Sequence, residues 1–248
     1  LTASEKGPWA NSYDRWRNDN LTHRYQGVQF GYTSAGRYTS WEDIWSYNIY
    51  KDRDILPGDY KYEDWNGDGE INGQDEHPFA FDQTPWLNYS LNIGLEYKNF
   101  DFNMLLQGSA LGSMEYKEPL YSIWGTNGGG TLEQYLDRWH PNDPTADPYD
   151  PATTWTSGHY GYTGRYPKSN SEFNRVSTAY LRLKSIEVGY TLPRISRMPN
   201  VSLRVYANAY NLLTFTGVKF VDPEHPDDDL GRMYPLNKTY TLGLSLSF

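Results

Sequence analysis

The stretch that decides the fold is Tyr240-Thr-Leu-Gly-Leu-Ser-Leu-Ser-Phe248. Its apolar residues occupy every second position and alternate with threonine, glycine and serine, so one face of the strand is apolar and the other is small and polar. A soluble sheet tolerates such a strand. In an outer-membrane barrel, however, each feature has a reason: the apolar face meets lipid, the polar face meets the lumen, and the final aromatic lies in the interfacial girdle. The pattern therefore favours a transmembrane β-strand.

The same alternation recurs upstream and predicts an all-β chain. Lys98-Asn99 forms a two-residue hairpin turn. A shift of phase between Leu183 and Ile186 predicts a bulge near Lys184-Ser185. The predicted strands are 89–97, 100–109, 180–192, 201–211 and 240–248, with a weaker one near 24–33.

Short and long connections alternate between these strands. The connections at 98–99 and 193–200 are short, whereas 110–178 and 212–238 are long, and a short helix is expected within the first at 132–139. Outer-membrane barrels have short periplasmic turns and long extracellular loops. About six strands would leave two open edges in lipid, so residues 1–248 are expected to be the C-terminal segment of a larger barrel.

Composition excludes several classes of protein. The net charge of −9 argues against nucleic acid as a partner, and the absence of cysteine leaves disulfides uninformative. No stretch approaches the roughly 18 apolar residues of a transmembrane helix. The chain starts at Leu1 without a signal peptide, which suggests processing or membership of a longer protein.

One acidic loop has the spacing of a calcium site. In Asp64-Trp-Asn-Gly-Asp-Gly-Glu-Ile-Asn-Gly-Gln-Asp75, side-chain oxygens of the first, third and fifth residues would bind the ion, together with one main-chain carbonyl and a closing carboxylate. The alternative is an Asx/Gly-rich turn without metal. The predicted Ca²⁺ ligands, which would brace an external loop, are Asp64, Asn66, Asp68, Glu70 and Asp75.

Other candidate sites are weaker. The histidines have no metal-ligand spacing, and Glu224–Asp229 is expected to be a solvated acidic loop tip rather than a second cation site. No nucleophile, phosphate or dinucleotide motif is present, and nothing selects a pair of glycosidase carboxylates. The loop tryptophans and tyrosines suit sugar stacking and loop packing equally well. We therefore expect no enzyme.

Several segments together resemble the C-terminal region of the SusC/RagA family of TonB-dependent outer-membrane transporters. They occur in the family's order and cover nearly the whole chain after about residue 25, whereas Leu1–Arg24 matches nothing. The segments are Gly31–Ile44, Pro57–Asn72, Tyr97–Gly108, Ala179–Pro193, Asn211–Gly217, Asp222-Pro-Glu224 and Tyr234–Phe248.

The resemblance implies a barrel of about 22 strands with a plug. It also implies import of an oligosaccharide or peptide across the bacterial outer membrane, energised through TonB, with a SusD-like lipoprotein as partner. The rival interpretations are a secreted, calcium-braced carbohydrate-binding β-domain and a surface glycoside hydrolase. In the barrel interpretation, the residues expected to line the channel or contact the plug are Arg182, Lys184, Arg204, Tyr206 and Tyr210.

Overall fold

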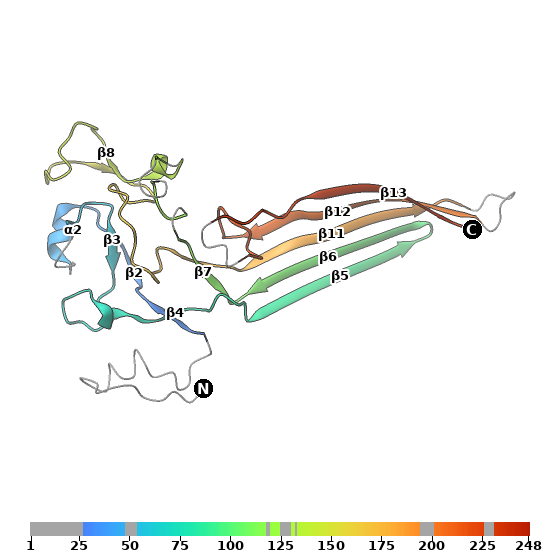
Figure 1. Cartoon of the computed structure of the whole chain (residues 1–248), viewed down its shortest axis with the longest axis horizontal. Helices are drawn as coiled ribbons and strands as arrows, with labels where there is room; N and C mark the ends of the chain where they lie inside the picture. The colour runs from blue at the N-terminus through green and yellow to red at the C-terminus, as the bar shows by residue number, and fades with distance from the viewer. Residues whose placement is uncertain are drawn as a thin grey trace, which may run out of the picture. The chain divides into compact units, whose positions relative to one another are not determined.

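The structure, a computed structural model, divides into two compact units (Figure 1). The sheet unit comprises Gln83–Ser113, Ser177–Asp228 and Arg232–Phe248, and the loop unit comprises Leu1–Asp82, Met114–Val176 and Asp229–Gly231. The residues that the structure describes are 27–47, 54–117, 120–124, 130–131, 133–193, 201–225 and 231–248.

The sheet unit is built on five antiparallel strands in the order β13-β12-β11-β6-β5 (Figure 1). The predicted strands are confirmed, although β12 continues to Thr216, beyond the predicted end at Asn211. Lys98 turns the hairpin between the first two strands with a φ of 55°. The strands are β5 (Leu87–Tyr97), β6 (Phe100–Ala110), β11 (Tyr180–Thr191), β12 (Ser202–Thr216) and β13 (Thr239–Ser247).

The predicted bulge is confirmed in β11. The register against both neighbouring strands shifts between Leu183 and Ser185. Opposite this bulge, Asn211 of β12 has a left-handed backbone conformation with a φ of 54°. The extra residue of a bulge shifts the alternation of side chains by one position. The apolar side chains before and after the bulge therefore lie on the same face of β11.

The apolar face of the sheet is open. On β13, Leu242 and Leu244 are 85% and 72% exposed. The same face carries exposed Leu91 and Leu95 on β5 and Phe215 on β12. Contiguous apolar surface on this scale marks a region that another apolar medium or partner covers.

Glycine is required where a tyrosine crosses this face. Tyr89 pairs with Gly108 across the hairpin, and its hydroxyl donates to the carbonyl of Tyr180 at 2.9 Å. A Cβ at Gly108 would lie 2.4 Å from that carbonyl oxygen and 2.4 Å from the Tyr89 ring. Because Gly108 has no side chain, the Tyr89 ring can lie over the main chain at this position and reach the carbonyl of Tyr180.

The loop unit contains short elements. Its strands pair in two-stranded sheets, β1 (Gln29–Gly31) with β4 (His77–Ala80), β2 (Ser34–Arg37) with β3 (Tyr60–Tyr62), and β8 (His140–Pro141) with β9 (Trp155–Thr156). A further two-stranded sheet pairs β7 (Ser113–Glu115) with β10 (Arg175–Ser177). The helices are α2 (Trp41–Ser46), η2 (Gly73–Asp75) and η4 (Glu133–Asp137).

Three expectations for this region need correction. The weaker strand predicted near 24–33 does not join the large sheet, because β1 pairs with β4 instead; residues 24–26 lie outside the described residues. The stretch 110–178 is not wholly irregular, because it contains the short strands β7, β8, β9 and β10. The helix predicted at 132–139 is a short 3₁₀ helix, with Leu132 outside the described residues.

Aromatic residues form the cores of the loop unit. One cluster contains Tyr32, Tyr62 and Ile71, with Tyr60 and Phe173 against it. A second contains Tyr38, Ile44 and Ile55. Among the described helices, none has the length and apolar character needed to cross a membrane.

Gly108→Ala should destabilise the folded full-length protein by about 1–3 kcal/mol, because the new methyl group meets a main-chain oxygen that cannot move away. Gly94→Ala is the matched control in the same hairpin, since its nearest neighbour is the side-chain oxygen of Asn103 at 3.2 Å. The temperature at which the folded band is lost on a semi-native gel measures both. Equal melting of the two variants would contradict this account.

Candidate functional site

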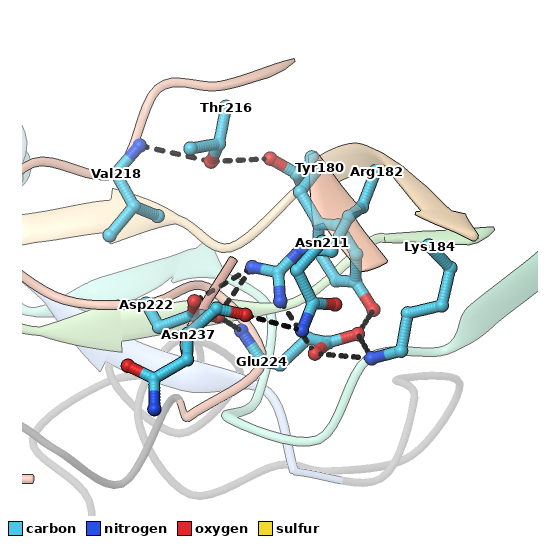
Figure 2. Close-up of polar contacts among 10 residues, drawn as sticks. Tyr180, Arg182, Lys184, Asn211, Thr216, Val218, Asp222, Glu224 and Asn237 are labelled. Carbon is cyan, nitrogen blue, oxygen red and sulfur yellow. Dashed lines mark hydrogen bonds and ion pairs between the residues drawn. The ribbon is translucent and has the colours of Figure 1, made fainter. Parts of the chain in front are cut away.

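The polar face of the sheet carries an ion-pair cluster near the start of β11. Arg182 projects from this strand and is 1% exposed. Its Nη2 donates to both carboxylate oxygens of Asp222, at 2.7 and 2.8 Å, and its Nη1 donates to Glu224 Oε2 at 2.8 Å. One buried guanidinium thus holds two carboxylates from the connection that follows β12 (Figure 2).

Two neighbours on β11 complete this cluster. Lys184 Nζ lies 3.0 Å from Glu224 Oε2, and the hydroxyl of Tyr180 donates to Glu224 Oε1 at 2.9 Å. The backbone N–H of Glu224 donates to Asp222 Oδ1 at 2.9 Å, which sets the two carboxylates side by side. We call Tyr180, Arg182, Lys184, Asp222 and Glu224 the latch.

The connection is held at other points as well. Thr216 Oγ1 donates to the carbonyl of Ala179 at 2.9 Å and accepts from the N–H of Val218 at 3.1 Å. Farther along, Asn211 Nδ2 donates to the carbonyl of Asn237 at 3.1 Å (Figure 2). These bonds fold the described parts of this long connection onto the edge of the polar face.

The latch corrects one expectation about the acidic loop tip. The sequence predicts that Glu224 belongs to a solvated tip at Glu224–Asp229, but its carboxylate is bound by Arg182, Lys184 and Tyr180. Residues 226–230 lie outside the described residues. Compared with apolar residues of similar volume, a buried ion pair adds little net stability. It nevertheless fixes the position of its two partners, because separating them leaves an unpaired charge in the protein.

A second ion-pair cluster lies farther along the same face. Arg204 of β12 donates through Nε to Asp101 of β6 at 3.0 Å and also contacts Glu187 of β11 at 2.6 Å. Asp101 and Arg204 meet above Gly189, where a Cβ would lie 2.4 Å from the Asp101 carboxylate. Because Gly189 of β11 has no side chain, Asp101 of β6 and Arg204 of β12 can form an ion pair across the strand that separates them.

The predicted channel-lining residues are all on described strands. Arg182 and Lys184 belong to the latch and Arg204 to the second cluster. Tyr206 pairs with Gly189 and Gly243, and the guanidinium of Arg204 lies 4.9 Å from its ring centre. Tyr210 is half exposed on the same face. Sequence reasoning missed their acidic partners Asp101, Asp222 and Glu224, because partners far apart in sequence give no spacing signal.

The calcium-type loop lies in the loop unit and is folded by its own carboxylates. The N–H groups of Gly67 and Gly69 donate to Asp64 at 2.8 and 2.9 Å. Asn66 Oδ1 accepts from the N–H of Asp68, and Asp68 Oδ1 accepts from the N–H of Glu70. These Asx turns bring the predicted oxygen ligands into one tight loop.

Asp75 closes this loop from inside the protein. It is 0% exposed, and its oxygens accept from the N–H groups of Trp65 at 3.0 Å and Asn72 at 2.7 Å. Burial raises the pKa of the Asp75 carboxyl, and the nearby negative charges of Asp64 and Asp68 add to this effect. Within the described ranges, no group of three or more His, Asp or Glu is arranged to hold a metal ion. Calcium binding therefore stays a prediction.

The described histidines have local contacts. His77 is buried, stacks on Trp65 with 3.8 Å between ring centres, and lies 2.6 Å from Thr33 Oγ1 through Nε2. His140 Nδ1 lies 3.0 Å from the carbonyl of Pro141. His23 lies outside the described residues.

Comparison with known proteins identifies the class. The chain is 30% identical over 209 residues to a TonB-dependent receptor of Formosa agariphila, covering 79% of the chain and 19% of that protein. It is 26% identical over 228 residues to the TonB-dependent receptor SusC of Bacteroides thetaiotaomicron, covering 91% of the chain and 20% of that protein. No protein-family model matches.

Solved structures agree on the fold. The RagAB peptide importer in its open-open state aligns with a TM-score of 0.55 at 21% identity, over 89% of this chain and 22% of that chain. The two relatives matched by sequence are named as TonB-dependent receptors, and this chain corresponds to a segment of that class of outer-membrane protein. The chain belongs to the SusC/RagA family of these transporters and spans about a fifth of the length of the relatives.

The latch yields a paired prediction. Arg182→Gln should destabilise the packing of the connection by about 3–5 kcal/mol, because it removes the guanidinium that binds the shielded Asp222 carboxylate and leaves Glu224 with Lys184 and Tyr180 alone. Lys184→Gln should cost about 0–1 kcal/mol, because its side chain is 31% exposed, against 2% for that of Arg182.

Limited proteolysis of the full-length protein in outer-membrane vesicles, followed by mass spectrometry of cuts within 217–225, measures this difference. Rapid cleavage is expected for Arg182→Gln alone. Equal protection of the two variants would show that the latch does not hold this connection in place.

Proposed function

We propose that this chain forms part of the barrel wall of an importer that carries a nutrient across the outer membrane with energy supplied through TonB. The observation that supports this most directly is the five-stranded sheet, which has an exposed apolar face and a polar face lined by ion pairs. Strands that face lipid on one side and a lumen on the other have this division. We further propose that the barrel has about 22 strands and a plugged lumen.

The nutrient is proposed to be an oligosaccharide or a peptide. RagAB is named as a peptide importer, which supports a peptide, whereas SusC is named only as a TonB-dependent receptor, so the oligosaccharide follows from the family resemblance alone. By the same family relation, we propose a SusD-like surface lipoprotein as the partner on the outer side. Transport requires no chemistry on the ligand, and the relatives are receptors and importers rather than enzymes.

Uptake by intact cells tests the import function. Cells of the source organism, with and without the gene, are given labelled oligosaccharide and peptide mixtures, and a protonophore is added to half of each culture. Import predicts uptake of one ligand class that needs both the gene and the proton gradient. Uptake that is insensitive to the protonophore would contradict TonB-dependent transport.

Cell fractionation separates this proposal from its rivals, the secreted carbohydrate-binding domain and the surface hydrolase. The importer predicts a detergent-requiring outer-membrane species, and co-purification with a lipoprotein would support the proposed partner. A soluble secreted species that carries this sequence would favour the rivals.

A bound Ca²⁺ in the 64–75 loop is a second part of the proposal. Its oxygen-only ligand set suits a hard cation. Asp64, Asn66, Asp68 and the main-chain carbonyl of Glu70 would supply most ligands. The carboxylate of Asp75 already holds backbone N–H groups. The ion would neutralise the concentrated negative charge and brace the loop.

Calorimetry of the full-length protein in detergent tests this part. The double variant Asp64→Asn plus Asp68→Asn should lose one Ca²⁺ site, whereas Glu63→Gln, an exposed acid just before the loop, should keep it. Unchanged stoichiometry in the double variant would rule out calcium in this loop.

A further inference from the structure

One end of the large sheet carries a row of aromatic side chains. Tyr97 of β5 lies opposite Phe100 of β6, which lies opposite Tyr190 of β11, so the three side chains share one face of the sheet. The ring centres of Phe100 and Tyr190 are 4.6 Å apart. We call these three residues the aromatic row; they lie where β5 turns into β6 (Figure 1).

The aromatic row forms the end of the apolar face. Tyr97 and Phe100 are 70% and 56% exposed. The next paired residues along this face are Leu95, Phe102 and Val188. In outer-membrane barrels, aromatic girdles flank the apolar band at the height of the lipid headgroups. The row therefore marks the level at which lipid headgroups would meet this sheet.

The turn after Tyr97 places a cation at the same edge. Lys98 is exposed, and its Nζ lies 5.2 Å from the centre of the Tyr97 ring, so the ammonium group is on the side of the aromatic row. A lysine at a membrane boundary lays its alkyl stem along apolar surface and keeps its charged end in the polar layer. The turn therefore presents a positive charge at the level of the headgroups.

The acidic residues of this hairpin that lie closest in sequence belong to the other face. Glu96 pairs with Asp101, one position from the aromatic pair, and successive residues of a strand alternate between faces. Asp101 is bound there by Arg204 of β12. These two carboxylates therefore lie on the opposite side of the sheet from the ring that Lys98 contacts.

We propose that Lys98 and the aromatic row bind the phosphate group of a glycerophospholipid. The ammonium group donates charge-assisted hydrogen bonds to phosphate oxygens, and the hydroxyls of Tyr97 and Tyr190 are further donors at the same edge. The acyl chains of the lipid lie along the apolar side chains beyond the row. An anionic head joined to an apolar tail is the ligand that uses both parts of this surface.

The apolar surroundings favour a lipid over free phosphate. The site is continuous with the open apolar face, on which Leu91 and Leu95 are 54% and 61% exposed. A free phosphate ion has no apolar part and would leave this surface unused. The inference rests on the proposed function, in which this face meets the membrane. In that arrangement the short β5–β6 turn faces the periplasm, so the lipid belongs to the periplasmic leaflet.

Photolabelling of the full-length protein tests this proposal without any import. The protein is held in dodecyl maltoside, a detergent without phosphate, with trace phosphatidylglycerol that carries a diazirine in its headgroup. A second probe carries the diazirine in an acyl chain and reports on the apolar face. Labelled residues are identified by peptide mass spectrometry in the unchanged protein, in Lys98→Gln and in Asn99→Gln, the matched control in the same turn.

The headgroup probe should label residues 97–100. Lys98→Gln should lower this labelling about fivefold, because a lysine near a lipid surface contributes about this factor in affinity. Asn99→Gln should leave the labelling unchanged, and Lys98→Arg should keep most of it, because the charge remains. Unlabelled phosphatidylglycerol should compete with the probe, whereas diacylglycerol and sodium phosphate should not. The acyl-chain probe should label residues 89–95 equally in all variants.

Equal headgroup labelling of Lys98→Gln and Asn99→Gln would overturn the proposal. Competition by diacylglycerol would overturn it by showing that the apolar surface alone binds lipid, and competition by sodium phosphate would overturn it by showing a site for free anions. If the acyl-chain probe fails to label β5, the lipid-facing wall of the proposed function fails as well. Loss of the Lys98 effect with intact labelling of β5 is a failure of this inference alone.

Discussion

The structure depends on one constraint: a strand in lipid must satisfy its backbone through neighbouring strands and must turn only apolar side chains outward. The five paired strands meet both demands over the described sheet, with leucine, tyrosine and phenylalanine on the open face. The polar face can then carry charges that would be costly in lipid. Its arginines are paired with Asp101, Glu187, Asp222 and Glu224.

These ion pairs join strands of the sheet to one another and to the connection after β12. The latch ties the connection after β12 to β11, and the second cluster joins β6, β11 and β12. Buried or shielded pairs specify geometry more than they add stability. In the loop unit, aromatic clusters, Asx turns and cation–ring contacts hold together segments with little regular structure.

Much of the sheet could be predicted from the sequence because the period of two is a local signal. The phase shift even located the bulge at Lys184, since a change of face appears directly in the order of apolar residues. The loop unit was not predictable in this way. Its contacts join residues that are far apart in sequence, as in Lys168 with Tyr32 or Arg165 with Asp59, and no local sequence pattern predicts such contacts. The partners of Arg182 could not be predicted for the same reason, because Asp222 and Glu224 lie about 40 residues from it in the sequence.

The most direct test of the central claim, that the alternating face of β13 meets lipid, is collision spin labelling in bilayers. These 248 residues contain no cysteine, so single cysteines at Leu244 and Ser245 can be introduced and labelled in the full-length protein once any cysteine outside this segment is replaced by serine. The account predicts that the label at 244 collides preferentially with lipid-soluble oxygen and that the label at 245 collides with a water-soluble nickel chelate. Equal exposure of both labels to the chelate, or the reverse order, would contradict the assignment of this sheet to a barrel wall.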